Sequence, residues 1–584
     1  MPTCSPASLP VSVLVAAVRG FKSAETADGR IPLAVQCRFR VPPADSGGRA
    51  AWTAIRAIPA EASGPVRMPG APDASDTSLL PRIARLSAAR RVSPHARSRS
   101  PFIRLAFALG RRQLAGMAQA TSLPRNESGI ETAIGVLKQR FGERLQTGRP
   151  VREQHGHTTT WIRNQPPDAV VFARSTEDVA EVVGVAAAHK APVIAYGTGT
   201  SLEGHVNAPA GGISVDVSQM NKVLEVHAED LDAVIQPGVT RKALNEELRD
   251  TGLFFPIDPG ADASLGGMAA TRASGTNAVR YGTMRDNVLS LEAVLPSGEI
   301  IRTGRRAKKS SAGYDLTRLL IGSEGTLGII TELTVKLHGI PEAMSSARCT
   351  FPAVDSACQA VITTIQMGVP VARIELLDAD CVAAINAYSR LDLPVNPLLL
   401  LEFHGSEAEV AAQATTFGEI ADEFGGTGFE WTASPEERTR LWQARHDGYW
   451  ALLASRPGKD TIATDVCVPI SNLAEAVERS QEEARRLGLY SPILGHVGDG
   501  NFHNTVFFDK DDDDERAKCE HFIAWLANLA IELDGTVTGE HGIGQGKIAS
   551  LSSELGTATE IMSAIKAALD PDNIMNPGKI VIPG

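Results

Sequence analysis

The chain has 584 residues, enough for three or four domains' worth of core, with 43% hydrophobic and 21% charged residues, as in ordinary globular proteins. No run of eighteen apolar residues occurs in the sequence, which argues against a membrane-spanning helix. The seven cysteines form no CxxC pair. This spacing argues against an iron–sulfur cluster or a zinc ribbon and fits a reducing compartment.

The charge is unevenly distributed along the chain. Residues 1–116 contain sixteen Arg and one Lys against six acids, whereas the whole chain has a formal charge of −11. Because this stretch is rich in Ala, Ser and Pro and has no apolar period, we expect residues 1–120 to be a disordered, Arg-rich extension or an over-extended gene start before Met117. The expected location is then the cytoplasm or the inner face of the membrane. The alternative is a mitochondrial transit peptide. Nucleic acid is not an expected partner, because the rest of the chain is acidic.

From residue 121 onward, the pattern opens as strand, helix, strand. A first helix is predicted at 130–141, followed by a strand at 169–175, a helix at 176–190 capped by Thr176, and a strand at 191–197. The later segments are short Val/Ile/Leu strands and one helix that ends at Gly252, predicted at 212–218, 233–239, 243–252, 290–301 and 328–337. We therefore predict an α+β fold for this half.

Beyond residue 340, segments of helical and strand type alternate up to a final helix and a Pro/Asn/Gly turn. This pattern predicts a second α+β domain with an antiparallel sheet and helices on one face. The expected domains are 121–342, 343–545 and a C-terminal segment, 546–584, that returns to the first domain.

Three loops rich in small residues lie in the first half. YGTGTSLEGH (196–205) follows a buried strand, and its glycines allow a ligand to approach the backbone closely. It matches neither the Walker loop nor the GxGxxG spacing. Residues 256–288 contain no helix-forming pattern, and GSEGTLGIIT (322–331) precedes another strand. Together, the three loops predict a large, flat, phosphate-bearing ligand that is contacted mainly by backbone.

Two motifs near the C-terminus contain residues that can bind a metal. GHVGDGNFH (495–503) contains His496 and His503, and GEHGIGQGK (539–547) contains Glu540 and His541. A tight turn at 497–500 between two extended segments would bring the first two imidazoles together. Two imidazoles and a carboxylate suit a divalent transition metal with open positions, which leaves His541 free to act as a base.

From about residue 120 to 584, the chain resembles the FAD-dependent oxidoreductases of the vanillyl-alcohol-oxidase type. The three loops resemble that family's flavin-binding segments. GHVGDGNFH, GEHGIG and NPGK (576–579) are characteristic of its D-2-hydroxy-acid dehydrogenase branch. LWQARHDGYW (441–450) and TDVCVPIS (464–471) are most similar to the cytochrome-linked D-lactate dehydrogenases. The resemblance implies a two-subdomain FAD-binding domain of the para-cresol-methylhydroxylase type and an α+β substrate (cap) domain.

The resemblance also implies roles for particular residues. His541 matches the catalytic base, Arg445 the arginine that grips the substrate carboxylate, and His496, His503 and Glu540 the ligands of a divalent metal, zinc or manganese. FAD is expected to bind without a covalent bond. The residues expected at the flavin are Tyr196, Gly197, Thr198, Gly199, Thr200, Ser201, Gly204, His205, Pro256, Asp258, Pro259, Ser264, Gly267, Ser274, Gly275, Tyr281, Gly282, Ile330 and Asn576.

The implied reaction is the FAD-dependent oxidation of D-lactate to pyruvate, with electrons passed to a cytochrome or a quinone. D-2-hydroxyglutarate and glycolate are alternative substrates; the first needs a second cationic contact for its extra carboxylate. An alternative from another class is the family's alkyl-glycerone-phosphate-synthase-like transferase, against which the His496, His503 and Glu540 set argues. A homodimer is a further expectation.

Overall fold

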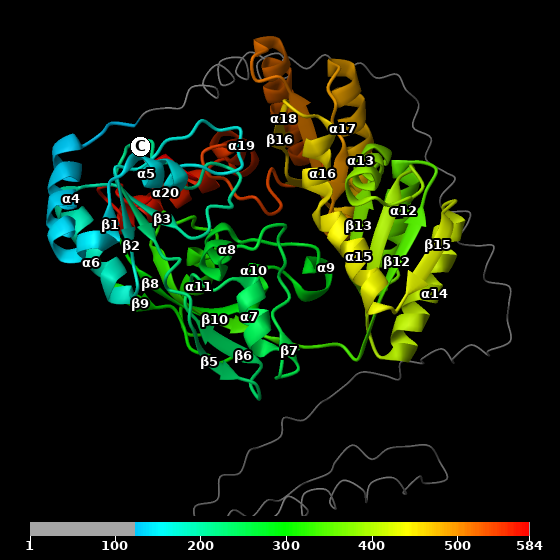
Figure 1. Cartoon of the computed structure of the whole chain (residues 1–584), viewed down its shortest axis with the longest axis horizontal. Helices are drawn as coiled ribbons and strands as arrows, with labels where there is room; N and C mark the ends of the chain where they lie inside the picture. The colour runs from blue at the N-terminus through cyan, green and yellow to red at the C-terminus, as the bar shows by residue number, and fades with distance from the viewer. Residues whose placement is uncertain (1–122, 583–584) are drawn as a thin grey trace, which may run out of the picture. The chain divides into compact units, whose positions relative to one another are not determined.

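The computed structural model describes residues 123–582. The expected extension 1–120 lies outside the described residues. Within them, no helix is both long and apolar enough to cross a membrane. The α+β prediction is confirmed, because helices cover a small mixed sheet and two larger antiparallel sheets (Figure 1), and two further short strands pair separately.

The first sheet contains four strands in the order β1-β2-β4-β3, in which β2, β4 and β3 run parallel and β1 is antiparallel. Its strands bury Val and Ile side chains against apolar residues of α4 and α6, and these elements share one core. The opening strand–helix–strand pattern is therefore confirmed. The elements are α4 (Glu127–Phe141), β1 (Leu145–Gln146), α5 (Arg149–His155), β2 (Ala169–Phe172), α6 (Thr176–His189), β3 (Val193–Tyr196) and β4 (Ile213–Asp216).

The cap of α6 differs from the prediction. Ser175, and not Thr176, is the N-cap residue, and its hydroxyl accepts a hydrogen bond from the backbone N–H of Asp178 at 3.2 Å. The Thr176 hydroxyl instead donates to Glu292 at 2.9 Å. Both residue types can cap a helix, so sequence alone did not distinguish them.

The second sheet is antiparallel, with the order β5-β6-β10-β8-β9. It packs on α7, α8 and α11 around a core that includes Leu244, Met268 and Leu333. The predicted strand 290–301 is two strands, because Pro296 to Gly298 lie in a turn. The elements are β5 (Val223–His227), β6 (Asp232–Ile235), α7 (Arg241–Leu248), β8 (Val288–Val294), β9 (Ile300–Arg302), α11 (Leu316–Leu320) and β10 (Ile329–Lys336). Nearby, β7 (Leu253–Phe254) and β11 (His338–Gly339) form a separate antiparallel pair.

The expectation of a loop without helices at 256–288 is wrong. Three short helices lie there: α8 (Leu265–Thr271), α9 (Ala278–Tyr281) and α10 (Met284–Asn287). Helix α8 has the sequence LGGMAAT, whose two glycines disfavour a helix by about 1 kcal/mol each. Leu265, Met268 and Ala269 are buried in the core of the second sheet, so tertiary packing outweighs that cost.

The third sheet forms after residue 340 and is antiparallel throughout, in the order β15-β12-β14-β13-β18-β19-β16, with β17 also paired to β19. The antiparallel prediction is confirmed. The strands are β12 (Ala343–Thr350), β13 (Val371–Leu377), β14 (Leu398–Gly405), β15 (Thr427–Thr432), β16 (Asp460–Ala463), β17 (Val466–Cys467), β18 (Ile493–Gly495) and β19 (Asn501–Phe508).

Helices cover both faces of this sheet, so the prediction of helices on one face is wrong. One face packs on α12, α14, α17 and α18, and the other packs on α13, α15 and α16 (Figure 1). Nearly every residue of β13 and β14 is buried, so these strands lack the alternation that marks a solvated face. The helices are α12 (Val354–Gln366), α13 (Ala379–Ser389), α14 (Glu407–Glu423), α15 (Pro435–His446), α16 (Gly448–Ser455), α17 (Leu473–Leu487) and α18 (Asp513–Glu532).

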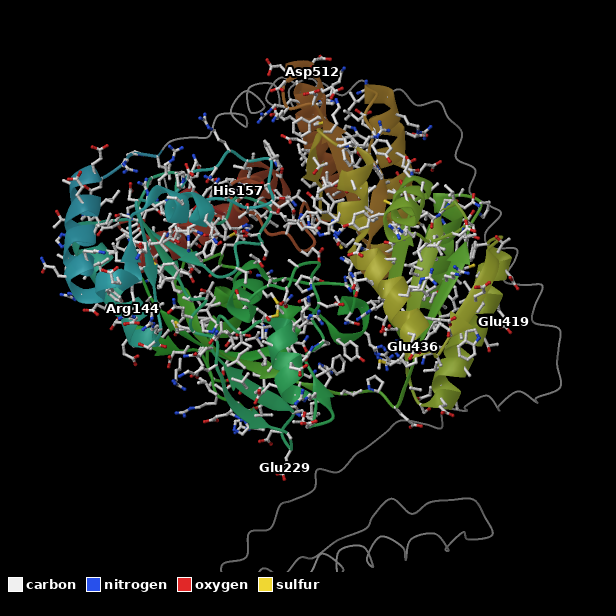
Figure 2. The ribbon with its side chains drawn as sticks, viewed as in Figure 1. Arg144, His157, Glu229, Glu419, Glu436 and Asp512 are labelled. Carbon is white, nitrogen blue, oxygen red and sulfur yellow. The ribbon has the colours of Figure 1, made fainter. Side chains whose placement is uncertain are left out.

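The last described segment lies against the first sheet. After α19 (Ile548–Leu555) and α20 (Ala558–Leu569), the backbone of Val193 in β3 accepts a hydrogen bond from Asn576 N and donates one to Ile574 O, each at 2.8 Å. Met575 is completely buried in the core of that sheet. Charged residues such as Glu229, Glu419 and Asp512 point outward to solvent (Figure 2).

Candidate active site

A cavity of about 510 Å³ is lined by residues from both halves of the chain. Most of the residues predicted for the site border it. They are Tyr196, Gly197, Thr198, Gly199, Thr200, Ser201, His205, Asp258, Pro259, Ser264, Gly267, Ser274, Ile330, Arg445, His496, His503, Glu540, His541 and Asn576. The cavity therefore unites the glycine-rich loops with the two histidine motifs.

Five residues predicted to contact the flavin do not line the cavity: Gly204, Pro256, Gly275, Tyr281 and Gly282. The Tyr281 hydroxyl lies 2.7 Å from His404 Nδ1 on β14, so this side chain connects the two halves. Pro256 O accepts a hydrogen bond from Asn277 at 2.9 Å. These residues shape the loops beside the cavity.

In the loop 196–205, a side chain in place of Gly197 or Gly199 would force a neighbouring hydroxyl to move. A Cβ on Gly197 would lie 2.3 Å from Ser264 Oγ, and one on Gly199, whose φ is +67°, would lie 2.4 Å from the Tyr196 hydroxyl. The hydroxyls of Ser201 and Ser264 are buried and have no hydrogen-bond partner among the described residues. Unpaired donors beside an exposed loop backbone fit the pyrophosphate of FAD.

Glu324 ties the loop that carries His541 to the FAD-binding half. Its carboxylate accepts hydrogen bonds from the backbone N–H groups of Ile543 at 2.7 Å and Gly544 at 2.8 Å. His205 Nε2 lies 3.3 Å from the same carboxylate. Burial opposes ionisation of Glu324, but His205 and the two backbone donors keep its pKa below the usual value. A charged clamp therefore fixes residues 543–544 beside the flavin loops.

The three predicted metal ligands lie together. The turn at Val497–Asp499 between β18 and β19 is confirmed, and it brings His496 and His503 to the same carboxylate. Each Nε2 lies 3.3 Å from Glu540 Oε1, and Glu540 Oε2 is buried with no hydrogen-bond partner among the described residues. Ligand atoms about 2.0–2.2 Å from one tetrahedral ion lie roughly 3.3–3.6 Å apart. The residues therefore fit a divalent metal.

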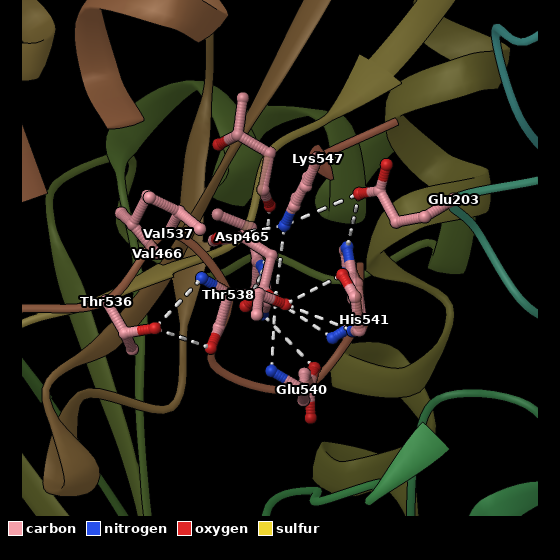
Figure 3. Close-up of polar contacts among 12 residues, drawn as sticks. Glu203, Asp465, Val466, Thr536, Val537, Thr538, Glu540, His541 and Lys547 are labelled. Atoms are coloured by element: carbon pink, nitrogen blue, oxygen red, sulfur yellow. Dashed lines mark hydrogen bonds and ion pairs between the residues drawn. The ribbon is translucent and has the colours of Figure 1, made fainter. Parts of the chain in front are cut away.

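Asp465 holds the backbone that carries Glu540 and His541 (Figure 3). Its Oδ2 accepts the N–H of each of these residues at 2.9 Å and the Thr538 hydroxyl at 2.8 Å. Its Oδ1 accepts Asn501 Nδ2 at 2.8 Å. Burial alone would raise the pKa of Asp465, but nearby Lys547 and these donors hold it well below the usual range. One buried carboxylate thus fixes the backbone of both predicted site residues.

His541 lies next to the three predicted metal ligands in the cavity. Its ring stacks on that of His503, with centroids 5.2 Å apart and planes within 7°. Its Nδ1 is buried, has no hydrogen-bond partner among the described residues, and lies 3.9 Å from Glu203 Oε1. Burial lowers the pKa of His541 to about 4, so the ring is neutral at neutral pH and can accept a proton.

Lys547 and Glu203 form a buried pair beside His541 (Figure 3). Lys547 Nζ lies 3.4 Å from Glu203 Oε1 and donates to the backbone oxygen of Asp465 at 3.1 Å. Burial raises the pKa of Glu203 although Lys547 opposes the shift. The positive charge of Lys547 thus offsets the negative charge of Glu203, next to the carboxylates of Asp465 and Glu540.

Arg445, on α15, also lines the cavity. It is 7% exposed, and its Nε and one terminal nitrogen donate to Glu375 Oε2 at 2.9 and 2.6 Å. Arg445 is the only Lys or Arg among the described residues that line the cavity. The cavity therefore offers one positive side chain to an anionic ligand.

Five residues of this site were missed from the sequence: Glu203, Glu324, Glu375, Asp465 and Lys547. All except Glu375 lie inside or directly beside the motifs described above, whose recognisable pattern comes from glycine and histidine and not from these residues. Glu375 lies in VARIELL, an ordinary strand sequence without any local signal.

Family models match both halves of the chain. Residues 167–304 match "FAD binding domain", and residues 340–580 match "FAD linked oxidases, C-terminal domain". The first match covers the loop at 196–205, and the second covers Arg445, His541 and the three predicted metal ligands.

Similar proteins agree with these matches. A probable mitochondrial D-lactate dehydrogenase of Danio rerio is 51% identical over 78% of this chain and 92% of its own length. The mitochondrial D-lactate dehydrogenase [cytochrome] of Arabidopsis thaliana is 45% identical over 77% and 80%. The solved structure of p-cresol methylhydroxylase shares the fold, with a TM-score of 0.66 at 16% identity over 79% and 98%. The chain therefore belongs to the FAD-linked oxidoreductases of the para-cresol-methylhydroxylase type, in their D-2-hydroxy-acid dehydrogenase branch.

Proposed function

We propose that this enzyme oxidises D-lactate to pyruvate, with FAD accepting two electrons and a divalent metal beside it. The observation that carries the proposal is the cavity itself, which unites one arginine, a metal-type ligand set and a neutral buried imidazole with the flavin loops. The names of the relatives from Danio rerio and Arabidopsis thaliana support D-lactate as the substrate.

His496, His503 and Glu540 would hold the metal, for which zinc and manganese both suit the donors. When bound, the metal would lower the pKa of the substrate hydroxyl. Glu540 stays ionised for this purpose: burial opposes its charge, but the two histidines keep its pKa well below the usual value.

Of the other side chains, one binds the substrate and another takes its proton. Arg445 binds the substrate carboxylate by a charge-assisted hydrogen bond and thereby orients C2. His541 takes the hydroxyl proton, and Asp465 keeps its backbone in place. FAD, when bound, supplies the acceptor for the hydride of C2.

The single positive side chain favours a monocarboxylate. D-2-Hydroxyglutarate has a second carboxylate that would need its own cationic partner when buried, and Arg445 can serve only one. Glycolate differs from D-lactate by one methyl group, which a pocket distinguishes by only about 1–3 kcal/mol. It therefore stays the nearest alternative substrate.

A cytochrome is the proposed final electron acceptor, with a quinone as the alternative, because the Arabidopsis thaliana relative is named for a cytochrome. Both relatives are named mitochondrial, which favours the transit-peptide alternative for residues 1–116 and a mitochondrial location. Mass spectrometry of the N-terminus of protein isolated from its source tests this: a retained residue 1 contradicts a cleaved leader.

The substrate is tested by mixing FAD-loaded protein anaerobically with D-lactate, L-lactate, glycolate and D-2-hydroxyglutarate. We expect the flavin absorbance to bleach fastest with D-lactate. Bleaching by L-lactate at the same rate, or by none of the four, contradicts the proposal.

The metal is tested with His503→Ala, compared with His521→Ala on the surface of α18. His503→Ala should lose metal and turnover but keep FAD, because His503 lies outside the glycine-rich loops. His521→Ala should keep all three, since His521 is about half exposed and lines no part of the cavity. Equal metal content in both variants argues against the site.

A further inference from the structure

Glu375 is a completely buried carboxylate at the centre of β13, and each of its oxygens has a different partner. Its Oε2 accepts hydrogen bonds from Arg445 Nε at 2.9 Å and from a terminal nitrogen of Arg445 at 2.6 Å. Its Oε1 lies 2.7 Å from His496 Nδ1. One side chain therefore joins the arginine to the first histidine of the metal ligand set.

The contact with His496 decides which imidazole nitrogen faces Glu540. A carboxylate oxygen can only accept, so Nδ1 carries the hydrogen that it donates to Glu375. The other nitrogen, Nε2, lies 3.3 Å from Glu540 Oε1 and would offer its lone pair to a metal bound between them in place of the proton that it otherwise shares with Glu540. An outer carboxylate of this kind orients a ligating imidazole and makes it a better donor.

The contact with Arg445 decides which edge of the guanidinium faces the cavity. Nε and one terminal nitrogen are directed to Glu375, and the second terminal nitrogen, Nη1, has no hydrogen-bond partner among the described residues. The planar guanidinium is held in one orientation, because its donors form a rigid fork. The free edge can then bind a carboxylate from the cavity.

We infer that Glu375 is a positioning residue that sets the spacing between the substrate-binding arginine and the metal-binding histidine. This inference rests on the proposed function. In a 2-hydroxy acid, the carboxylate and the hydroxyl are on adjacent carbons, so the groups that bind them must be correctly spaced. Glu375 lies on a strand paired on both sides, with β14 and with β18, and β18 ends directly before His496. The sheet thus supports both groups through one carboxylate.

Glu402 provides a matched control for the removal of a buried charge. It lies on the neighbouring strand β14, is 3% exposed, and also joins a histidine to arginines: its Oε1 lies 2.7 Å from His404 Nε2 and 3.7 Å from Arg373 Nε. Neither Glu402 nor His404 lines the cavity. A general effect of losing a buried Glu–His–Arg cluster should therefore appear in Glu402→Gln as well.

The experiment compares the wild type, Glu375→Gln, Glu375→Asp and Glu402→Gln, each loaded with FAD. The amide of Gln has one acceptor and cannot serve both His496 and Arg445, and the carboxylate of Asp is one methylene too short to reach both. We expect both Glu375 variants to bind Zn²⁺ and Mn²⁺ about 10–100-fold more weakly, as measured by calorimetry. Their KM for D-lactate should also rise. Glu402→Gln should melt at a lower temperature than the wild type but keep the metal affinity and KM.

The outcomes separate this inference from the proposed function. If the wild type neither binds metal nor reduces its flavin with D-lactate, the proposed function fails. If the wild type does both and the Glu375 variants match it in metal affinity and KM, only the positioning role is overturned. It is also overturned if Glu402→Gln loses as much metal affinity as the Glu375 variants. If Glu375→Gln does not fold, the charged Glu375→Asp variant decides between these outcomes.

Discussion

Replacing Asp465 by Asn should separate the fixation of the catalytic loop from general stability. Both oxygens of Asp465 accept hydrogen bonds, but an Asn side chain has only one acceptor oxygen and an NH₂ donor. If the Asn oxygen keeps the three bonds that Oδ2 accepts, its NH₂ group faces the NH₂ group of Asn501, and two donors meet. We assign about 1 kcal/mol to each of three bonds that lose their charge and about 1–3 kcal/mol to the facing donors, a loss of about 4–6 kcal/mol in all.

Asp378→Asn is the matched control. Asp378 is a buried carboxylate with one backbone N–H on each oxygen, from Cys381 at 2.9 Å and Ile493 at 2.8 Å, and it lines no part of the cavity. Its replacement also creates one pair of facing donors but weakens only one other bond, a loss of about 2–4 kcal/mol.

Two measurements are needed for both variants: the urea unfolding midpoint and the kcat of FAD-loaded protein with D-lactate. Both midpoints should fall, and that of Asp465→Asn should fall further. In addition, kcat should fall at least ~100-fold in Asp465→Asn alone, because displacement of a catalytic group by about 1 Å costs that much. A wild-type kcat in Asp465→Asn, or an equal loss in Asp378→Asn, would refute the reasoning.

His541→Ala should keep FAD and metal, while stopped-flow flavin reduction by D-lactate slows by about two to four orders of magnitude; an unchanged rate would mean that another group takes the proton. Arg445→Lys keeps the charge but loses the fork between Glu375 and the cavity, so KM for D-lactate should rise more than kcat falls in steady-state assays, and a wild-type KM would contradict this role. Burial lowers the pKa of Lys579 to about 7. Above that pH, the folded state therefore binds fewer protons than the unfolded state. The free energy of unfolding should then rise with pH from about 7 toward 10.5, by up to about 1.4 kcal/mol per pH unit. Urea unfolding at about pH 7 and pH 9 should show this rise for the wild type and not for Lys579→Met, whereas parallel curves would contradict the low pKa.

The sequence was most informative where a function needs an unusual local pattern. The glycines at 197 and 199 and the turn at 497–500 have few structural explanations, and their structures agree with the predictions. Helix α8 was missed because its glycine-rich sequence has low helix propensity and its stability comes from contacts with distant strands. Local pattern could not reveal packing of this kind.

The buried charges of the site were missed for a related reason. Glu375 finds its partners 70 and 121 residues further along the chain, and Glu324 finds its two backbone donors more than 200 residues away. A glutamate in a strand sequence is most simply predicted to face solvent. Only the folded chain shows that these carboxylates are enclosed with the groups they hold.

The pairing of β3 with residues 574–576 has a consequence for the order of folding during synthesis. Domains near the N-terminus generally fold as units while the rest of the chain is still being made. Here, Val193 finds its backbone partners about 380 residues later, and Asn576, next to the same strand, borders the cavity. Until residues 574–576 are made, the nascent FAD-binding half therefore has one edge of β3 without these backbone partners and an incomplete flavin pocket. We expect ribosome-bound chains that stop before residue 570 to capture FAD poorly, so that the cofactor enters only after translation is nearly finished.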